Sequence, residues 1–176
     1  MAGPRRSRPP LPNPPPLGAI VVDGSNVIAS SQQRPIERLD LVLAWCREWR
    51  PDLPVMVFVD LTTARRCRPD AQAVLRARCE DVAPQRPRYA VVPFEAMPDA
   101  EILRFAREHR GLVISNDRFF DHDELRRGVL TVQFTLAGDQ LVLADEATWF
   151  RPSGGAQRVP MADLRQPPLP PDDRAP

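Results

Sequence analysis

The stretch GAIVVDGSNVIAS, residues 18–30, runs from four apolar residues directly into an aspartate, a glycine, a serine and an asparagine. Its apolar, β-branched part at 19–22 predicts a short buried strand. A strand can end in aspartate because Asp and Gly favour turns, so Asp23 is either a turn residue or a ligand. The residues that follow the other strands of the chain decide between these two interpretations.

Apolar runs alternate along the chain with segments of helical periodicity. Strands are predicted at 19–22, 55–59, 88–92, 112–115, 129–135 and 140–143, the last two joined by an Ala-Gly-Asp turn. Helices are predicted at 36–49, 70–81 and 99–109, with a short one at 121–127. Because strands alternate with helices and are almost continuously apolar, the pattern indicates an α/β fold whose mainly parallel sheet is covered on both faces.

The distribution of proline predicts where the folded domain lies. The 176 residues fit one ordinary domain, yet seven of the 22 prolines fall in 4–16 and five in 167–176. We therefore expect a disordered Pro- and Arg-rich arm at 1–16, a folded domain at 17–152 and a disordered Pro-rich tail at 153–176. The sequence shows no secretory signal and no run long enough to span a membrane. A soluble, cytoplasmic protein without a membrane partner is expected.

Several classes of site find no support in the sequence. The three cysteines have no CxxC spacing, which argues against a disulfide framework or a zinc site. No GxSxG, Walker A loop or GxGxxG is present, so no small-molecule cofactor is expected. A haloacid-dehalogenase-type phosphatase would need an aspartate where Ser25 stands. The two histidines, His109 and His122, are expected to face solvent on helices rather than to act as an acid–base pair.

Acidic and amide side chains recur at the ends of the predicted strands. Asp23 follows the first strand, and Asn116 and Asp117 follow the strand at 112–115. The carboxyl ends of parallel strands share one edge of the sheet, and this is where such sheets bind ligands. Asp99 begins a helix that starts on the same edge, and Asp121 lies four residues after Asp117.

Each of these acids also has a purely structural explanation. Asp23 and Asp117 can cap turns, Asp99 can interact favourably with a helix dipole, and Asp121 with Glu124 fits a capping box. Four such explanations converging on one edge are less convincing than one shared site. Two carboxylates ~5 Å apart repel each other by roughly 3 kcal/mol at an effective dielectric constant of ~20, so a cation is expected to join them.

The chemistry of the acids selects the cation. Oxygen ligands without a nearby His or Cys suit Mg²⁺ or Mn²⁺. Such an ion supports phosphoryl chemistry, because it polarises the phosphate and lowers the pKa of a bound water. Asn26 is expected to orient that water or to hold a phosphate oxygen.

Three segments together show a family resemblance. VVDGSNV at 21–27, PDAEILRFA at 98–106 and GLVISNDRFFD at 111–121 resemble the nuclease domain of the Regnase-type CCCH zinc-finger ribonucleases, within the NYN/PIN-like superfamily. The likeness covers about residues 18–152. It implies a three-layer α/β/α sandwich that cleaves RNA with Mg²⁺ held by an acidic cluster, to which the two strands joined by the Ala-Gly-Asp turn add a C-terminal β-hairpin. It implies catalytic and metal-binding roles for four acids, beside Asn26: Asp23, Asp99, Asp117 and Asp121.

The chain departs from this family in two ways. The family usually has two adjacent aspartates in its middle motif, but here Pro98 precedes Asp99, and Glu101 or Asp60 is a candidate to replace the lost acid. The zinc finger is also absent. The chain therefore looks like a stand-alone, bacterial-type relative.

Arginines gather between 62 and 88, where seven of them face only three acids. An Arg-rich segment after a strand can contact an RNA backbone, although it can equally be a solvated helix face. The expected substrate contacts are Ser25, Arg65, Arg66, Asn116 and Arg118. Phe119 and Phe120 are candidates for base stacking, with at least one of them in the core.

These features predict a metal-dependent ribonuclease that hydrolyses single-stranded or loop RNA, and the resemblance implies that it cuts endonucleolytically. Two other functions stay open at this point. One is a catalytically degenerate protein that binds RNA or another protein, as the loss of an acid at Pro98 suggests. The other is a nuclease toxin held by a partner. The sequence also leaves a homodimer open.

Overall fold

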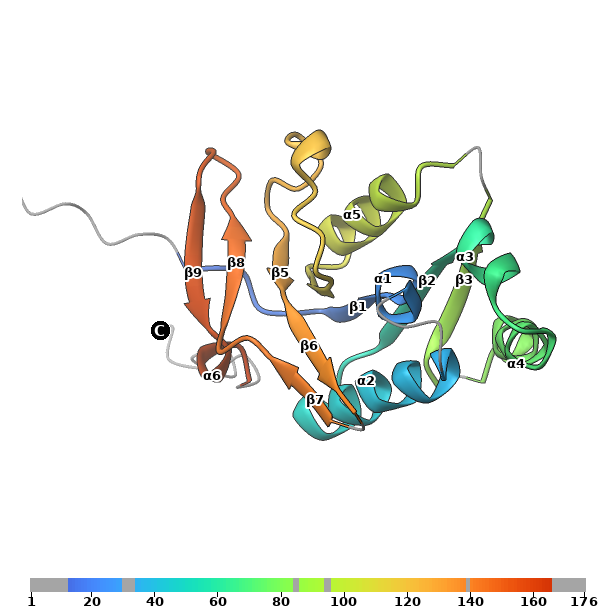
Figure 1. Ribbon diagram of the computed structural model, residues 1–176. Coiled ribbons are helices and arrows are strands. Elements are labelled where there is room, and N and C mark those ends of the chain that lie inside the picture. The colour runs from blue at the N-terminus through green and yellow to red at the C-terminus, as the bar shows by residue number, and fades with distance from the viewer. Residues whose placement is uncertain (1–12, 30–33, 84–85, 94–95, 139, 166–176) are drawn as a thin grey trace, which may run out of the picture.

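The main sheet of the protein has seven strands. The computed structural model describes residues 13–29, 34–83, 86–93, 96–138 and 140–165. The strands of the main sheet are β1 (Ala19–Asp23), β2 (Val55–Asp60), β3 (Arg88–Val92), β4 (Gly111–Ile114), β5 (Leu130–Val132), β8 (Glu146–Phe150) and β9 (Ala156–Pro160). Their order is β3-β2-β1-β4-β5-β8-β9 (Figure 1). The first five are parallel neighbours, whereas β8 and β9 are antiparallel.

Helices follow the strands and complete the layers. They are α1 (Gly24–Ala29), α2 (Pro35–Trp49), α3 (Leu61–Arg66), α4 (Pro69–Glu80), α5 (Pro98–Glu108) and α6 (Met161–Leu164), with a 3₁₀ turn, η1, at Phe120–His122. Proline stands at the first position of α2, α4 and α5, where its missing N–H has no helical partner to lose.

Two hydrophobic clusters lie on opposite faces of the sheet. Successive residues of a strand point to opposite faces, and β1 shows this alternation. Ile20 and Val22 pack with the α2 residue Leu39 in one cluster, whereas Val21 packs with the α5 residues Ile102 and Leu103 in the other. The expected α/β fold with a mainly parallel sheet covered on both faces is therefore confirmed.

The expected C-terminal hairpin is present, but it forms a sheet of its own. β6 (Phe134–Ala137) pairs antiparallel with β7 (Gln140–Leu143), and Figure 1 shows the pair lying beside α2. The single strand predicted at 129–135 is thus two strands, β5 and β6, in different sheets. The chain changes sheet at the exposed Gln133 between them.

Two helical segments also differ from the sequence-based expectation. α3 was not predicted, and it begins directly after β2 because the Asp60 carboxylate caps it by accepting a hydrogen bond from Thr63 N–H (2.7 Å). The helix predicted at 121–127 is only the 3₁₀ turn η1. That segment has a single apolar residue, Leu125, and therefore no apolar stripe to pack a helix. Gly128 follows with a φ of +84°, which is not helical.

The folded chain extends beyond residue 152, which differs from the tail predicted at 153–176. β9 pairs with β8, and Arg50 Nη1 donates a hydrogen bond to the Leu164 carbonyl (3.1 Å), which ties α6 to the end of α2. β9 gives a weak sequence signal because only Val159 in it is buried. Residues 1–12 and 166–176 lie outside the described residues. Among the residues that the structure does describe, no helix combines the length and apolar character needed to cross a membrane.

Candidate active site

Asp23 lies at the carboxyl edge of the sheet, where β1 ends, and its side chain is buried (5% exposed). Its Oδ1 accepts a hydrogen bond from Asn26 N–H (3.0 Å), and its Oδ2 accepts one from the Ser115 hydroxyl (2.7 Å). Burial raises the pKa of Asp23 to about 6, and the negative charges of Asp99 and Asp117 add to the rise. The carboxylate is therefore fixed in position and costly to ionise without a cation.

Gly24 and Ser25 fasten the end of β1 to the end of β2. A Cβ on Gly24 would lie 2.8 Å from both the Phe58 carbonyl oxygen and a Val59 methyl group, so only glycine fits this close approach. The Ser25 hydroxyl accepts a hydrogen bond from Asp60 N–H (2.7 Å). Ser25 was expected to bind substrate, and the contact that the structure gives it is this structural one.

Ser115 connects the ends of β1 and β4. It is fully buried, and its hydroxyl donates to Asp23 while accepting a hydrogen bond from Asp117 N–H (3.0 Å). The sequence analysis did not single out this residue. The available signal was a hydroxyl directly before Asn116 and Asp117 at the end of an apolar strand.

The two asparagines form a second connection across the same edge. Asn26 Oδ1 accepts a hydrogen bond from Asn116 N–H (3.2 Å), and Asn116 Oδ1 accepts one from Phe134 N–H (2.9 Å). Because Asn26 Oδ1 is engaged in this way, its Nδ2 group is what Asn26 can offer to a phosphate oxygen. Asn116 itself is exposed.

Asp99 stands in the first turn of α5 and is half-buried. Burial raises the pKa of Asp99, and repulsion from Asp117, Asp60 and Asp121 adds to the rise. These acids therefore lie close enough to act on one another. His122 also faces this group, because its Nε2 lies 4.0 Å from Asp99 Oδ2 and its side chain is only 12% exposed.

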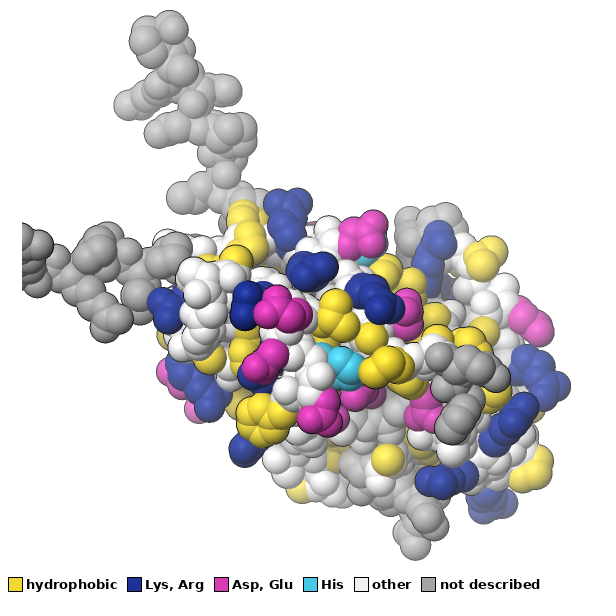
Figure 2. Space-filling view, turned by 90° about the horizontal axis from the view of Figure 1, so that it is seen from above, with side chains coloured by type: hydrophobic (Ala, Val, Ile, Leu, Met, Phe, Trp, Pro, Cys, Tyr) yellow, Lys and Arg dark blue, Asp and Glu magenta, His cyan; other side chains and the backbone are white. Residues whose placement is uncertain are grey.

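The position of His122 corrects the expectation that both histidines face solvent. The predicted helix at 121–127 would have turned it outward, whereas the 3₁₀ turn directs it towards Asp99. His109, by contrast, is exposed as expected. Figure 2 shows acidic side chains around a histidine on the face seen from above, with arginines close by.

Asp23, Asp99, Asp117 and Asp121 are called the acidic group below, and Asp117 and Asp121 are its exposed members. Asp117 Oδ1 accepts a hydrogen bond from Phe119 N–H (2.7 Å), which fixes the loop that leads from β4 into η1. The structure thus brings Asp23, Asp99 and Asp117 together, with Asp121 close enough to raise the pKa of Asp99.

The donor set fits a hard divalent cation. Among the described residues, no three His, Cys, Asp or Glu side chains are already grouped as ligands of a metal ion. The converging atoms are nevertheless carboxylate oxygens, which Mg²⁺ and Mn²⁺ prefer. A cation placed among them would also relieve the repulsion that, after burial, adds to the raised pKa of Asp23 and Asp99.

Of the two acids considered as replacements at Pro98, Asp60 is the better placed. Glu101 forms an ion pair with Arg104 on the surface of α5. Asp60 acts electrostatically on Asp99. Burial tends to raise the pKa of Asp60, but hydrogen bonds, chiefly from Thr63, lower it below its usual value. Asp60 is therefore an ionised carboxylate beside the group.

The arginines expected to contact substrate lie around this edge. Arg65 and Arg66 are exposed in the last turn of α3, which begins where β2 ends. Arg118 is exposed directly after Asp117, and its guanidinium carbon lies 5.9 Å from the centre of the Phe120 ring. All three side chains are exposed on segments that follow the carboxyl ends of β2 and β4.

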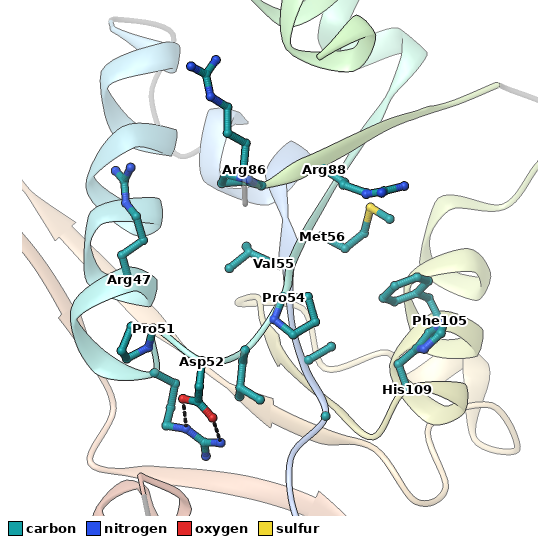
Figure 3. Close-up of a pocket in the computed structure, with 15 residues that line it drawn as sticks. Arg47, Pro51, Asp52, Pro54, Val55, Met56, Arg86, Arg88, Phe105 and His109 are labelled. Atoms are coloured by element: carbon teal, nitrogen blue, oxygen red, sulfur yellow. Dashed lines mark hydrogen bonds and ion pairs between the residues drawn. The ribbon is translucent and has the colours of Figure 1, made fainter. Parts of the chain in front are cut away.

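A cavity of about 840 Å³ lies at the opposite, amino edge of the sheet (Figure 3). None of the acids of the candidate site lines it, and most of its charged groups have local explanations. Arg50 forms two hydrogen bonds with Asp52 (2.8 and 2.7 Å). Arg86 pairs with Asp81, and Arg47 lies in the last turn of α2, where a cation is favourable. This cavity is therefore distinct from the candidate site.

A family model matches most of the described chain. Residues 16–148 match the model described as the Zc3h12a-like ribonuclease NYN domain. That range contains every residue of the candidate site. None of the curated proteins matches the sequence.

Two solved structures of one plant enzyme resemble this fold. Nuclear proteinaceous RNase P 2 (PRORP2) from A. thaliana matches with a TM-score of 0.54 at 15% identity, over 72% of this chain and 29% of that one. A second structure of the Arabidopsis thaliana protein matches with a TM-score of 0.52 at 15% identity, over 79% and 35% of the two chains. The PIN domain endonuclease Utp24 matches with a TM-score of 0.39 at 16% identity, over 71% and 90%. The chain spans about a third of the plant enzyme, and at these identities the likeness concerns the fold alone.

Proposed function

This chain belongs to the family of Zc3h12a-like ribonuclease NYN domains, and on that premise we propose that it is a metal-dependent ribonuclease. Its proposed reaction is the endonucleolytic hydrolysis of phosphodiester bonds in single-stranded or loop RNA. One observation carries the proposal. Asp23, Asp99 and Asp117 come from three separate parts of the chain and meet at the carboxyl edge, where burial and then the charge of neighbouring acids raise the pKa of Asp23 and of Asp99. A cluster so arranged is destabilising unless it holds a cation.

The acids would hold the ion, and the neighbouring residues keep them in place. Asp23, Asp99 and Asp117 are the proposed ligands, with Asp121 beside them. A bound Mg²⁺ or Mn²⁺ would polarise a phosphate oxygen and lower the pKa of a bound water. Ser115 holds the carboxylate of Asp23 and the backbone of Asp117 in a fixed relation through two hydrogen bonds.

Polar residues around the acids would bind the RNA backbone. Asn26 offers its Nδ2 group, because its Oδ1 is engaged by Asn116 N–H. Arg118 follows Asp117 directly, and Arg65 and Arg66 lie on α3. Guanidinium groups bind phosphate through paired hydrogen bonds, so these arginines would orient the strand across the acidic group.

Metal removal is expected to abolish cleavage. A 5′-labelled, partly structured RNA would be incubated with the purified protein in Mg²⁺, in Mn²⁺ and in EDTA, and the products resolved on a gel. We expect internal cuts in unpaired segments with either metal and none in EDTA, because the carboxylates alone neither polarise a phosphate oxygen nor lower the pKa of a water. Equal cleavage in EDTA by the purified protein would contradict the proposal.

A second function is favoured by one departure from the family. Pro98 stands where an adjacent aspartate is usual, and no ready-made group of three ligands is found among the described side chains. A protein that binds RNA without cutting it would give stable complexes in EDTA and no products in Mg²⁺ or Mn²⁺. The same gel, run beside a native binding gel, separates the two functions.

A further inference from the structure

Phe120 is an exposed aromatic ring at the rim of the acidic group. Phe120 is 66% exposed, although most phenylalanines in a folded domain are buried. It stands at the first position of η1, directly before Asp121 and two residues before His122, whose ring faces Asp99. An aromatic ring left in water next to a candidate catalytic centre calls for an explanation.

The backbone holds the ring outward. Phe119 takes the core position and is only 2% exposed, and it does so with a φ of 50°, in the left-handed region that a bulky residue rarely adopts. Its N–H donates to Asp117 Oδ1 (2.7 Å), and its carbonyl accepts a hydrogen bond from His122 N–H (3.0 Å). The turn that presents Phe120 is thus fixed by the same aspartate that belongs to the candidate site.

Two arginines flank the ring. The guanidinium carbons of Arg126 and Arg118 lie 5.4 and 5.9 Å from its centre, which is within the range of cation–π attraction. Arg126 is itself anchored, because it donates to the Arg118 carbonyl (3.2 Å) and pairs with Asp123. An exposed aromatic ring with guanidinium groups close to it is a combination that proteins use to bind unpaired bases and their phosphates.

We propose that Phe120 is a stacking platform for one unpaired base of the RNA bound at the candidate site, with Arg118 contacting the adjacent phosphate. The proposal rests on the proposed function and narrows its substrate to RNA with an accessible base beside the cut. A base inside a duplex is already stacked on its neighbours, so the platform disfavours paired substrates.

The surroundings of the ring favour a base over a protein partner. Protein interfaces centre on a contiguous apolar patch, whereas the exposed neighbours of Phe120 along the chain are charged: Arg118, Asp121, Asp123 and Glu124. A base needs only one ring face and a nearby cation. The isolated ring therefore matches a nucleotide better than it matches a protein surface.

The test is binding of short single-stranded RNAs in EDTA, measured by fluorescence anisotropy. The set contains the intact strand and strands in which one base at a time is removed to leave an abasic sugar. Wild-type protein is expected to bind about 5- to 150-fold more weakly when the stacked base is missing, the range found for single base–aromatic stacks. Phe120→Ala is expected to bind the intact strand with the same loss, and to show no further loss on the abasic strands.

Two variants sharpen this test. Phe120→Trp keeps a flat ring and should retain the discrimination, whereas Phe120→Leu keeps apolar volume without a ring face and should lose it. Val82→Ala, at a 70% exposed position away from the candidate site, is the matched surface control and should behave as wild type. The proposal is overturned if Phe120→Ala binds the intact strand as wild type does, if it still discriminates abasic strands, or if no strand binds.

The two proposals can fail separately. Stacking is read from binding in EDTA, and cleavage is read in Mg²⁺. Abasic discrimination without any cleavage would retain the platform and refute the ribonuclease. In a cleaving enzyme, Phe120→Ala should raise KM by a similar factor with little change in kcat, and an effect confined to kcat would contradict stacking.

Discussion

Replacing Asp117 by asparagine is expected to slow RNA cleavage by roughly 10²- to 10⁴-fold, the range over which one group acting in a transition state contributes. The change removes a negative charge from the acidic group but keeps the oxygen that accepts the hydrogen bond from Phe119 N–H. Asp117 is exposed, so the fold should survive. The measurement is the single-turnover cleavage rate in Mg²⁺, with circular dichroism as a check on folding.

Glu124→Gln is the matched control for Asp117→Asn. Its side chain is 77% exposed in the same loop and pairs with Arg127 rather than with the acidic group, so its rate should stay close to that of wild type. Wild-type cleavage by Asp117→Asn would remove this residue from the site. Equal losses in both variants would show that general charge, rather than the acidic group, governs the rate.

Replacing Asp23 by asparagine is expected to stabilise the metal-free protein at neutral pH while abolishing its activity. Burial raises the pKa of Asp23 from 3.8 to about 6, so the folded state holds a proton more tightly than the unfolded state does. The free energy of unfolding therefore falls as pH rises through this window, by roughly 3 kcal/mol in total for this one group. Asparagine has no charge to bury and avoids the loss.

This effect is measured by urea unfolding in EDTA at pH values between 3.8 and about 6, and at higher pH. The stability of Asp23→Asn relative to wild type should increase steadily through the window and then stay constant. Residues shared by the two proteins cancel in the difference, apart from neighbouring acids such as Asp99. If the free energy of unfolding depended on pH in the same way in both proteins, the carboxylate of Asp23 would not be held in an unfavourable environment.

The positions of the main acids could be predicted because two simple rules act together. Almost continuous apolar runs indicate buried parallel strands, and polar residues directly after such strands gather at one edge of the sheet. Asp23, Asn116 and Asp117 satisfy both rules and lie at the ends of β1 and β4. Asp99 follows from the same logic, because the helix that it begins starts on that edge.

Other parts of the site depend on contacts that no local pattern encodes. Ser115 matters only because β1 and β4 pair, which brings its hydroxyl to an aspartate 92 residues away in the sequence. His122 faces Asp99 only because the expected helix is a 3₁₀ turn. Which of Phe119 and Phe120 would be buried is likewise set by the left-handed backbone of Phe119, a conformation that its residue type does not favour.

Mn²⁺ binding tests most directly whether the acids form one cation site. Isothermal titration calorimetry at neutral pH would compare wild type with Asp23→Asn, Asp99→Asn, Asp117→Asn and the control Glu124→Gln. We expect each aspartate variant to bind Mn²⁺ at least about tenfold more weakly than wild type, and the control to bind as wild type does. Equal binding by all five proteins would contradict the account, because the acids would then lie at one edge without sharing a metal ion.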